Sequence, residues 1–505
     1  MQFSEVISFT FLVDKHKPQN IITKKKPNNK YYLLYTGIIG KKLKTENEAK
    51  SFLYPDPQKQ RQFTVLKQRF TQILSDVYLS FDFSETTIYY KSEYQKVLNR
   101  CFKNWAAGMI LHEKGVKKIS TEIFETVLRN SLKFDLIELS LFILKELKFH
   151  FGLLEDNKFK FKTYSKKYLE IKQLYDFKEE AEDLYLKLGQ LVTKSKSYEY
   201  NENVKNLELR VLNLLAMVEE IDSFFTKYYA YNAVYFISLI KKDIENQILI
   251  CKKALKYFNS KKQFKKIGLF SFTQKAGISY LSIKDYQKAS EYLLECMKFK
   301  LPQTSISWLY VRSYLFQLHI LRKDYLSAYN ITSDVTNNKS FNKINETYRE
   351  PWYLKEAFIH FLIKIGKINP RESDAQKLRP FRLSRFMNEV SMFSNDKRGL
   401  NITINIIQML FYIVDERFDD ALDKLSSLRQ YNFRYLKRPE YARSSNFIKM
   451  LLKIPEGDYE PKKIRAKAQK YHQSLLDNPS DYSEHALSIE IIPYEQLWEE
   501  IMSIF

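Results

Sequence analysis

Histidine and cysteine, the residues that most often do chemistry, are few in this chain and lie far apart. The seven histidines are at positions 16, 112, 150, 319, 360, 472 and 485, with no pair four residues apart and no cysteine close by. Zinc sites need clustered nitrogen and sulfur ligands, so this spacing predicts no metal site. His319 and His360 lie in apolar stretches with helical spacing, which predicts packed imidazoles there.

Two short stretches approach known catalytic motifs but differ from them where the chemistry is carried. GIIGKK (Gly37–Lys42) has too short a gap between its glycines for a phosphate-binding loop, and Lys42 stands where that loop needs a hydroxyl. HEKGV (His112–Val116) ends in valine, where a zinc protease has its second histidine. The sequence therefore predicts a protein that is not an enzyme and has no catalytic residues, metal or cofactor.

The cysteines and the apolar stretches favour a cytoplasmic protein. Cys101, Cys251 and Cys296 form no CxxC pair and lie among apolar residues, a pattern typical of buried free thiols in a reducing compartment. The first residues lack the basic start of a secretion signal. The longest apolar stretch, Ile402–Val414, is too short and too interrupted to span a bilayer. We therefore expect no membrane span.

The formal net charge of +23 raises the question of a polyanionic partner. The cations are 63 lysines and 19 arginines, whereas dedicated phosphate-binding surfaces favour the arginine fork. Two lysine clusters are interleaved with aromatic residues and form a candidate basic patch, namely Lys158, Lys160, Lys162 and Lys261, Lys262, Lys265, Lys266. Such clusters either hold nucleic acid or are the solvated faces of amphipathic helices. A nucleic-acid partner is therefore kept as an alternative.

Composition and periodicity predict an all-α fold. Only 11 glycines and 13 prolines occur in 505 residues, which favours long helices joined by short links over turn-rich folds. Apolar residues recur at helical spacing over most of the chain, as in Phe63, Leu66, Phe70 and Leu74. Thr45 and Glu48 have the spacing of a capping box, which predicts a helix start at this point.

Four regions follow from this reading. Residues 1–43 contain β-favouring stretches around a polar, proline-containing segment and predict an irregular arm or small β-hairpin. Residues 44–160 predict an N-terminal helical region, 161–455 a set of helical repeats, and 456–505 a C-terminal helical cap. The last helix carries Leu497, Trp498, Ile501 and Phe505 on one face, which predicts that it covers the end of the array. The best candidates for irregular connections within the helical array are residues 196–203, 336–350 and 370–382.

The stretch Gly277–Pro302 has small and aromatic residues at spacings that fit a pair of antiparallel helices. Gly277 and Ala289 would let the two backbones approach, Tyr280 and Tyr286 would fill the groove, and Pro302 would end the second helix. The pattern returns at Tyr325 with Ala328, where Phe316 replaces the small residue, and at Phe418 with Ala421, where Met409 does so. Three such units predict a degenerate helical repeat.

These units resemble the tetratricopeptide repeat, a helix pair of about 34 residues. The resemblance implies a right-handed α-solenoid whose first helices line a concave groove. The groove positions carried over from the family are Gln274, Ile278, Tyr310, Ser313 and Gln317. The lysines and asparagines with which some family members hold a terminal carboxylate are absent at these sites, so the groove is expected to suit an extended or helical segment.

Both ends of the chain also resemble repeat proteins of Bacteroidetes-type bacteria, through KTENEAKSFLYPDP and IIPYEQLW. No activity follows from that resemblance. The expected function is a non-catalytic scaffold or adaptor that binds a protein or peptide through its concave surface. Two alternatives stay open: a basic protein associated with nucleic acid or ribosomes, and a sensor or adaptor subunit of a bacterial defence or regulatory complex.

Overall fold

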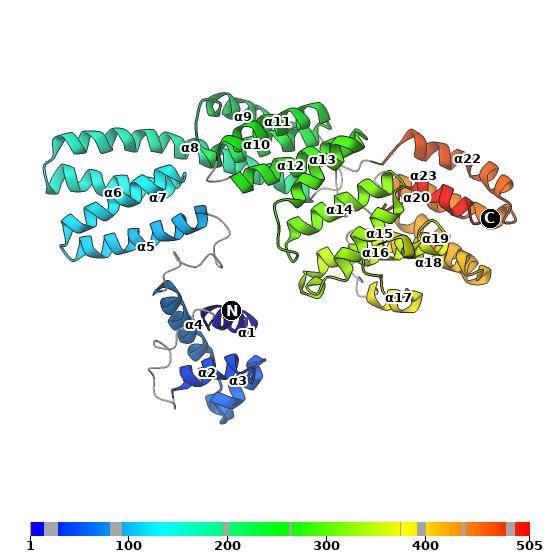
Figure 1. Ribbon diagram of the computed structural model, residues 1–505, viewed down its shortest axis with the longest axis horizontal. Helices are drawn as coiled ribbons and strands as arrows, with labels where there is room; N and C mark the ends of the chain where they lie inside the picture. Colours follow the sequence, from blue (N-terminus) through cyan, green and yellow to red (C-terminus); the bar gives the residue numbers. More distant parts are fainter. Residues whose placement is uncertain are drawn as a thin grey trace. The chain divides into compact units, whose positions relative to one another are not determined.

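The helices of the chain pack in sequence order within two separate units (Figure 1). The computed structural model describes residues 2–14, 29–80, 93–194, 201–261, 265–373, 375–390, 400–436, 441–480 and 490–505. Over these ranges all regular secondary structure is helical, so the predicted all-α class is confirmed. The two units are Met1–Lys172 and Gln173–Phe505. The predicted boundary at residue 160 falls inside a long helix, and the predicted domain limits stay predictions.

The first part of the N-terminal unit is a small helical core. Its elements are α1 (Phe3–Asp14), α2 (Lys30–Ile39), α3 (Glu46–Leu53), the 3₁₀ turn η1 (Pro57–Lys59) and α4 (Gln62–Ser80). Helices α1 and α4 contact each other, and both contact α2. Phe3, Leu34, Phe63 and Phe70 are buried in this core. The capping box predicted for Thr45 and Glu48 is present at the start of α3.

The β-hairpin or irregular arm expected over residues 1–43 is wrong for the part of that segment that the structure describes. Both β-favouring stretches are helices, α1 and α2. The burial pattern gives the reason, because Phe3, Val6, Thr10 and Val13 in α1 share one helical face and pack into the core. Tertiary packing thus overrides the local β propensity of Ile, Val, Phe and Tyr.

The rest of the N-terminal unit is a row of helical hairpins. It contains α5 (Glu93–Glu113), α6 (Lys117–Lys133), α7 (Ile137–Phe149), the π-helical turn η2 (His150–Leu154) and the start of α8 (Lys158–Lys194). Gly108 lets α5 approach α6, since a Cβ at this position would lie 2.7 Å from the Phe124 ring. The Ser131 and Ser140 hydroxyls meet at 2.8 Å between α6 and α7. Small residues therefore set the helix spacing here as well.

The C-terminal unit continues the same pattern. Its helices after α8 are α9 (Glu202–Val218), α10 (Phe224–Ile240), α11 (Ile244–Ser260), α12 (Lys265–Ser282), α13 (Tyr286–Met297), α14 (Ile306–Leu321), α15 (Tyr325–Thr336), α16 (Glu346–Lys364), α17 (Leu383–Val390), α18 (Leu400–Val414), α19 (Phe418–Tyr435), α20 (Ala442–Leu451), α21 (Lys453–Glu456), α22 (Pro461–Asp477) and α23 (Tyr494–Met502). Two 3₁₀ turns, η3 (Phe341–Lys343) and η4 (Pro370–Glu372), lie between them. From α9 to α16, each helix contacts the next (Figure 1).

One turn geometry joins the two helices of many hairpins. In the α12–α13 turn, Lys284 has a positive φ of 62° and its amide bonds the Leu281 carbonyl, while the Asp285 amide bonds the Tyr280 carbonyl. Asp285 then caps α13 by accepting from the Lys288 amide. Positive-φ residues with the same two backbone bonds occur at Gly115, Asp135, Lys242, Lys323, Gly366 and Glu416. The same turn is a common end of helices, and its recurrence is consistent with a helical repeat.

The small residues that predicted the helix pairs are buried where helices meet. Ala289, Ala328 and Ala421 are at most 2% exposed. Gly277 packs under Leu293, whose Cγ would lie 2.9 Å from a Cβ added to the glycine. The predicted pairing of helices around these positions is confirmed.

The hairpin that begins with α16 departs from the others. Its turn is the usual one, with Gly366 at a φ of 76° and the Lys367 amide bonded to the Leu362 carbonyl. Of the residues described between this turn and α17, only the short η4 is helical, and residues 376–382 have no regular secondary structure. Helices α13, α15 and α19 fill the corresponding place in their own hairpins. The irregular connection predicted for residues 370–382 is therefore confirmed, apart from η4. The one predicted for 336–350 is partly wrong, because η3 and the start of α16 lie within it, and most of 196–203 lies outside the described residues.

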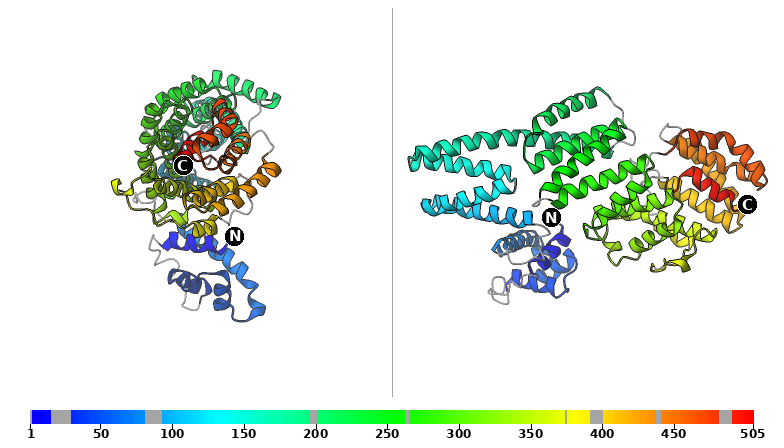
Figure 2. Two further views of the ribbon diagram at one scale, coloured as in Figure 1. Left: turned by 90° about the vertical axis from the view of Figure 1, so that its right-hand side faces the viewer. Right: turned by 45° about the horizontal axis from the view of Figure 1, so that its top comes forward.

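The last helix, α23, packs against α20 and α22 (Figure 2). Its Gln496 amide nitrogen donates to the Ile320 carbonyl at the end of α14. Trp498, Leu497 and Ile501 are buried. The Tyr325 hydroxyl donates to Glu500 at 2.6 Å. The apolar face of α23 is therefore buried within the C-terminal unit, and its role as a cap at the end of the array stays a prediction. None of the helices described is both long and apolar enough to cross a membrane.

Candidate peptide-binding surface

The groove residues predicted from the resemblance lie on α12 and α14. Ile278 and Ser313 are buried in the core, 8% and 3% exposed. Gln274, Tyr310 and Gln317 are half-buried, and the Tyr310 ring packs edge-on against Tyr348 at 6.1 Å. The Gln317 Nε2 is buried and has no hydrogen-bond partner among the described residues. The role of all five residues in binding a partner stays a prediction.

The predicted basic residues are divided between the two units. In the N-terminal unit, Lys158 and Lys162 are exposed, while Lys160 pairs with Glu125 at 3.1 Å and lies 4.3 Å from the Phe151 ring. In the C-terminal unit, Lys261 pairs with Asp222 and lies over the Tyr257 ring, and Lys266 is exposed. Lys262 and the Lys265 side chain lie outside the described residues. Two of these lysines thus serve local ion pairs.

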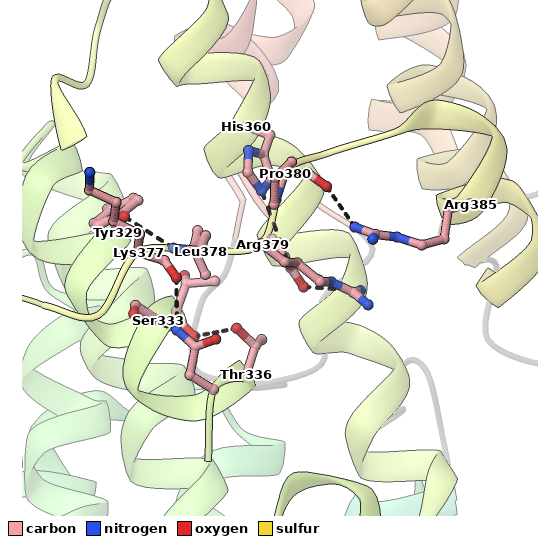
Figure 3. Close-up of polar contacts among 12 residues, drawn as sticks. Tyr329, Ser333, Thr336, His360, Lys377, Leu378, Arg379, Pro380 and Arg385 are labelled. Carbon is pink, nitrogen blue, oxygen red and sulfur yellow. Dashed lines mark hydrogen bonds and ion pairs between the residues drawn. The ribbon is translucent and has the colours of Figure 1, made fainter. Parts of the chain in front are cut away.

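A different surface of the C-terminal unit holds an extended stretch of the chain itself. Residues 375–382 run from η4 to α17 along α15 and α16 (Figure 3). The sequence favours this conformation, because Pro380 disfavours a helical Arg379 and removes a backbone donor. We call residues 375–382 the extended segment. The slot is the surface around it, formed by α15, α16, Glu389 of α17 and Phe411 of α18.

Side chains of α15 hold the backbone of the extended segment. Asn337 Nδ2 donates to the Gln376 carbonyl at 3.4 Å and to the Lys377 carbonyl at 3.3 Å, and the Ser333 hydroxyl also donates to the Gln376 carbonyl. The Leu378 amide donates to the Tyr329 hydroxyl at 3.2 Å. Tyr329 and Ser333 are four residues apart on one face of α15, and Asn337, the residue that caps the helix after Thr336, follows Ser333 at the same spacing. These bonds recognise extended backbone whatever its side chains.

Arg379 supplies the main side-chain contact. Its guanidinium donates to Glu356 of α16 at 3.0 and 3.4 Å and to both oxygens of Glu389 of α17 at 2.8 Å. The ring of Tyr353 lies 5.7 Å from the guanidinium carbon. Each carboxylate is therefore held by two bonds, the geometry that favours arginine over lysine.

An aromatic contact follows two residues later. The Phe381 ring stacks on Phe411 of α18 at 4.3 Å and lies 5.2 Å from the His360 ring of α16. His360 is also hydrogen-bonded to the backbone of Arg379. Residues at i and i+2 of extended chain point to the same side, so Arg379 and Phe381 both contact α16.

The charges of the slot depend on one another. Burial raises the pKa of Glu356, which is 3% exposed, although Arg379 works against that shift. Burial, with the positive charges of Arg379 and Arg385, lowers the pKa of His360 to about 4. His360 is therefore neutral at pH 7. The slot then presents two carboxylates and a neutral imidazole to the Arg379 guanidinium, while the Arg385 Nε lies 3.9 Å from Glu389.

Sequence reasoning identified the irregular stretch but not the slot that holds it. The two prolines were the available signal for the extended conformation. A second signal was Glu356 four residues before His360 in an apolar helix, since a buried carboxylate needs a cation. Nothing local in the sequence identified Arg379 as that cation, because Glu389 and Glu356 flank it from different helices.

Other chemistry is sparse in the described parts of both units. They contain no group of three His, Cys, Asp or Glu side chains placed to hold a metal ion. The thiols of Cys101, Cys251 and Cys296 are free and buried, as predicted, and burial raises the pKa of each. Comparison of the chain with family models, curated proteins and solved structures finds no match.

Proposed function

We propose that this chain is a non-catalytic scaffold of tetratricopeptide-like helix pairs, a right-handed α-solenoid that binds a protein partner. The repeated hairpin turn and the buried small residues Gly277, Ala289, Ala328 and Ala421 support the repeat assignment. The buried free thiols favour a reducing compartment and hence the cytoplasm.

The observation that carries the proposal is the extended segment on the slot. Ser333, Asn337 and Tyr329 bond its backbone, while Glu356 and Glu389 bind its arginine. A surface that binds main-chain groups and one charged side chain of an extended peptide has the properties needed for protein recognition. Gln274, Tyr310 and Gln317 are proposed as further contacts.

The proposal is tested by cross-linking the full chain to its neighbours in its native cells, followed by purification and peptide mapping. A protein partner should be recovered at a constant ratio, with cross-links on α12–α16, and nuclease treatment should not release it. Recovery of the chain alone would contradict the proposal. Recovery of RNA or DNA, with binding that weakens steeply as salt rises, would favour the nucleic-acid alternative instead.

A further inference from the structure

The slot lies where the other hairpins place a helix. Helix α13 packs between α12 and α14, and α15 between α14 and α16, through buried apolar side chains such as Leu293 and Val335. In the hairpin of α16, the extended segment takes that place, with Ala375, Leu378 and Phe381 only partly buried. It buries less apolar surface than a helix would, so polar contacts contribute more to holding it.

Those polar contacts require an arginine. Glu356 is almost fully buried, and without the Arg379 guanidinium its charge would face the His360 Nε2 at 4.0 Å and the more distant charge of Arg385. An unpaired buried carboxylate is unfavourable, so the slot selects an occupant that brings a positive charge. Two carboxylates, each bound twice, match the fork of arginine and not the point charge of lysine.

We propose that the slot recognises extended segments of a partner protein that carry an arginine followed two residues later by an aromatic residue, and that residues 375–382 are its intramolecular stand-in. This inference rests on the proposed scaffold function and names the class of segment bound. The occupant's own sequence, Leu-Arg-Pro-Phe at 378–381, defines the chemistry: a backbone kept extended by proline, a guanidinium for two carboxylates and a ring for His360 and Phe411.

A partner segment competes with a tethered one. A short tether gives the stand-in an effective concentration in the millimolar range, so free peptide binds the native chain weakly. A partner that also contacts other parts of the scaffold gains the same advantage and can displace the stand-in. The slot is then open only to partners that engage more than one surface.

The test uses a fluorescent synthetic peptide with the sequence of residues 371–383 and the full chain. In a variant with Arg379→Ala and Phe381→Ala, the tethered occupant is weakened, and the peptide should bind about 100-fold more tightly than to the native chain. Adding Asn337→Ala or Glu356→Gln to that variant should reduce binding at least about tenfold. A scrambled peptide of the same composition is the control for charge.

The outcomes separate this inference from the scaffold proposal. The slot assignment would be overturned if the scrambled and native peptides bound equally, or if no peptide bound the variant with Arg379→Ala and Phe381→Ala. The scaffold proposal would still hold in that case if cross-linking recovered a protein partner. If that variant fails to fold, the native chain is used with a photoreactive residue in place of the peptide's phenylalanine. Cross-links to α16 or α18 would then support the slot, and cross-links elsewhere would overturn it.

Discussion

Two hairpins of the C-terminal unit begin alike and end differently. The hairpin of α12 and the hairpin of α16 share the same turn, with a positive-φ residue, Lys284 or Gly366, and the same two backbone bonds. After it, α13 forms and buries Leu293 against Gly277, whereas residues 376–382 stay extended and depend on α15 and α16 for their hydrogen bonds. The turn therefore sets the direction of the chain. The residues after the turn decide whether the chain that follows forms a helix or stays non-helical and is held by side chains of neighbouring helices.

The comparison predicts that the helical hairpin depends on apolar packing. Leu293→Ala removes a fully buried side chain and should lower the local free energy of unfolding by about 3 kcal/mol. The matched control is Leu294→Ala on the same helix, where the side chain is 53% exposed, and it should cost well under about 1 kcal/mol. Hydrogen exchange of the α12 and α13 amides measures both. Equal costs would mean that α13 does not pack as described.

The extended segment should instead depend on its arginine. Arg379→Ala leaves Glu356 buried without its guanidinium and should destabilise the segment by about 2 kcal/mol. This is less than the usual cost of breaking a fully buried ion pair, because the Arg379 side chain is 40% exposed and its charge is partly screened by solvent. Arg382→Ala, at an exposed position three residues later, is the control and should change little. Exchange rates over residues 375–382 report the difference. A similar effect of the two substitutions would remove the special role of Arg379.

The slot should also respond to pH through His360. Because its pKa is lowered to about 4, the unfolded chain takes up a proton below about pH 6.5 that the folded chain resists, so stability is lost as pH falls from 6.5 toward 4. Between pH 7 and pH 5, the free energy of unfolding of the native chain should fall by about 1–2 kcal/mol more than that of the His360→Asn variant. Urea unfolding midpoints measure both.

Neighbouring groups do not obscure that result. The raised pKa of Glu356 acts in the opposite direction, since a carboxyl that protonates more easily when folded gains stability as pH falls. Glu356, Arg379 and Arg385 are present in both proteins, so their main contributions cancel in the difference. A pH-independent difference would show that His360 is not the buried neutral group described.

The smallest expected effect comes from a single backbone contact. Tyr329→Phe keeps the ring, which is 1% exposed, but removes the hydroxyl that accepts from the Leu378 amide. The segment should lose about 1 kcal/mol of local stability, with no change in the α14 amides. Faster exchange that spreads into α14 would instead indicate a general packing defect.

The two hairpins also show how far the sequence carries. Gly277 and Ala289 identified the helix pair because helix packing depends on residue size at periodic positions, and the same signal at Gly108 and Ser140 was overlooked. Helices α1 and α2 were not predictable from local propensity, because their β-favouring residues become helical through packing into the core. The slot was not predictable residue by residue, since Asn337, Glu356 and Glu389 come together around Arg379 only through tertiary packing.

The most direct test of the account is hydrogen exchange at single-residue resolution in the full chain, with and without excess peptide of residues 371–383. The Leu378 amide should be protected about tenfold in the free chain, because it is bonded to Tyr329. Saturating peptide should abolish that protection while α15 and α16 keep theirs. An unprotected Leu378 amide in the free chain, or protection that the peptide cannot change at saturation, would contradict the claim that the slot holds an exchangeable peptide.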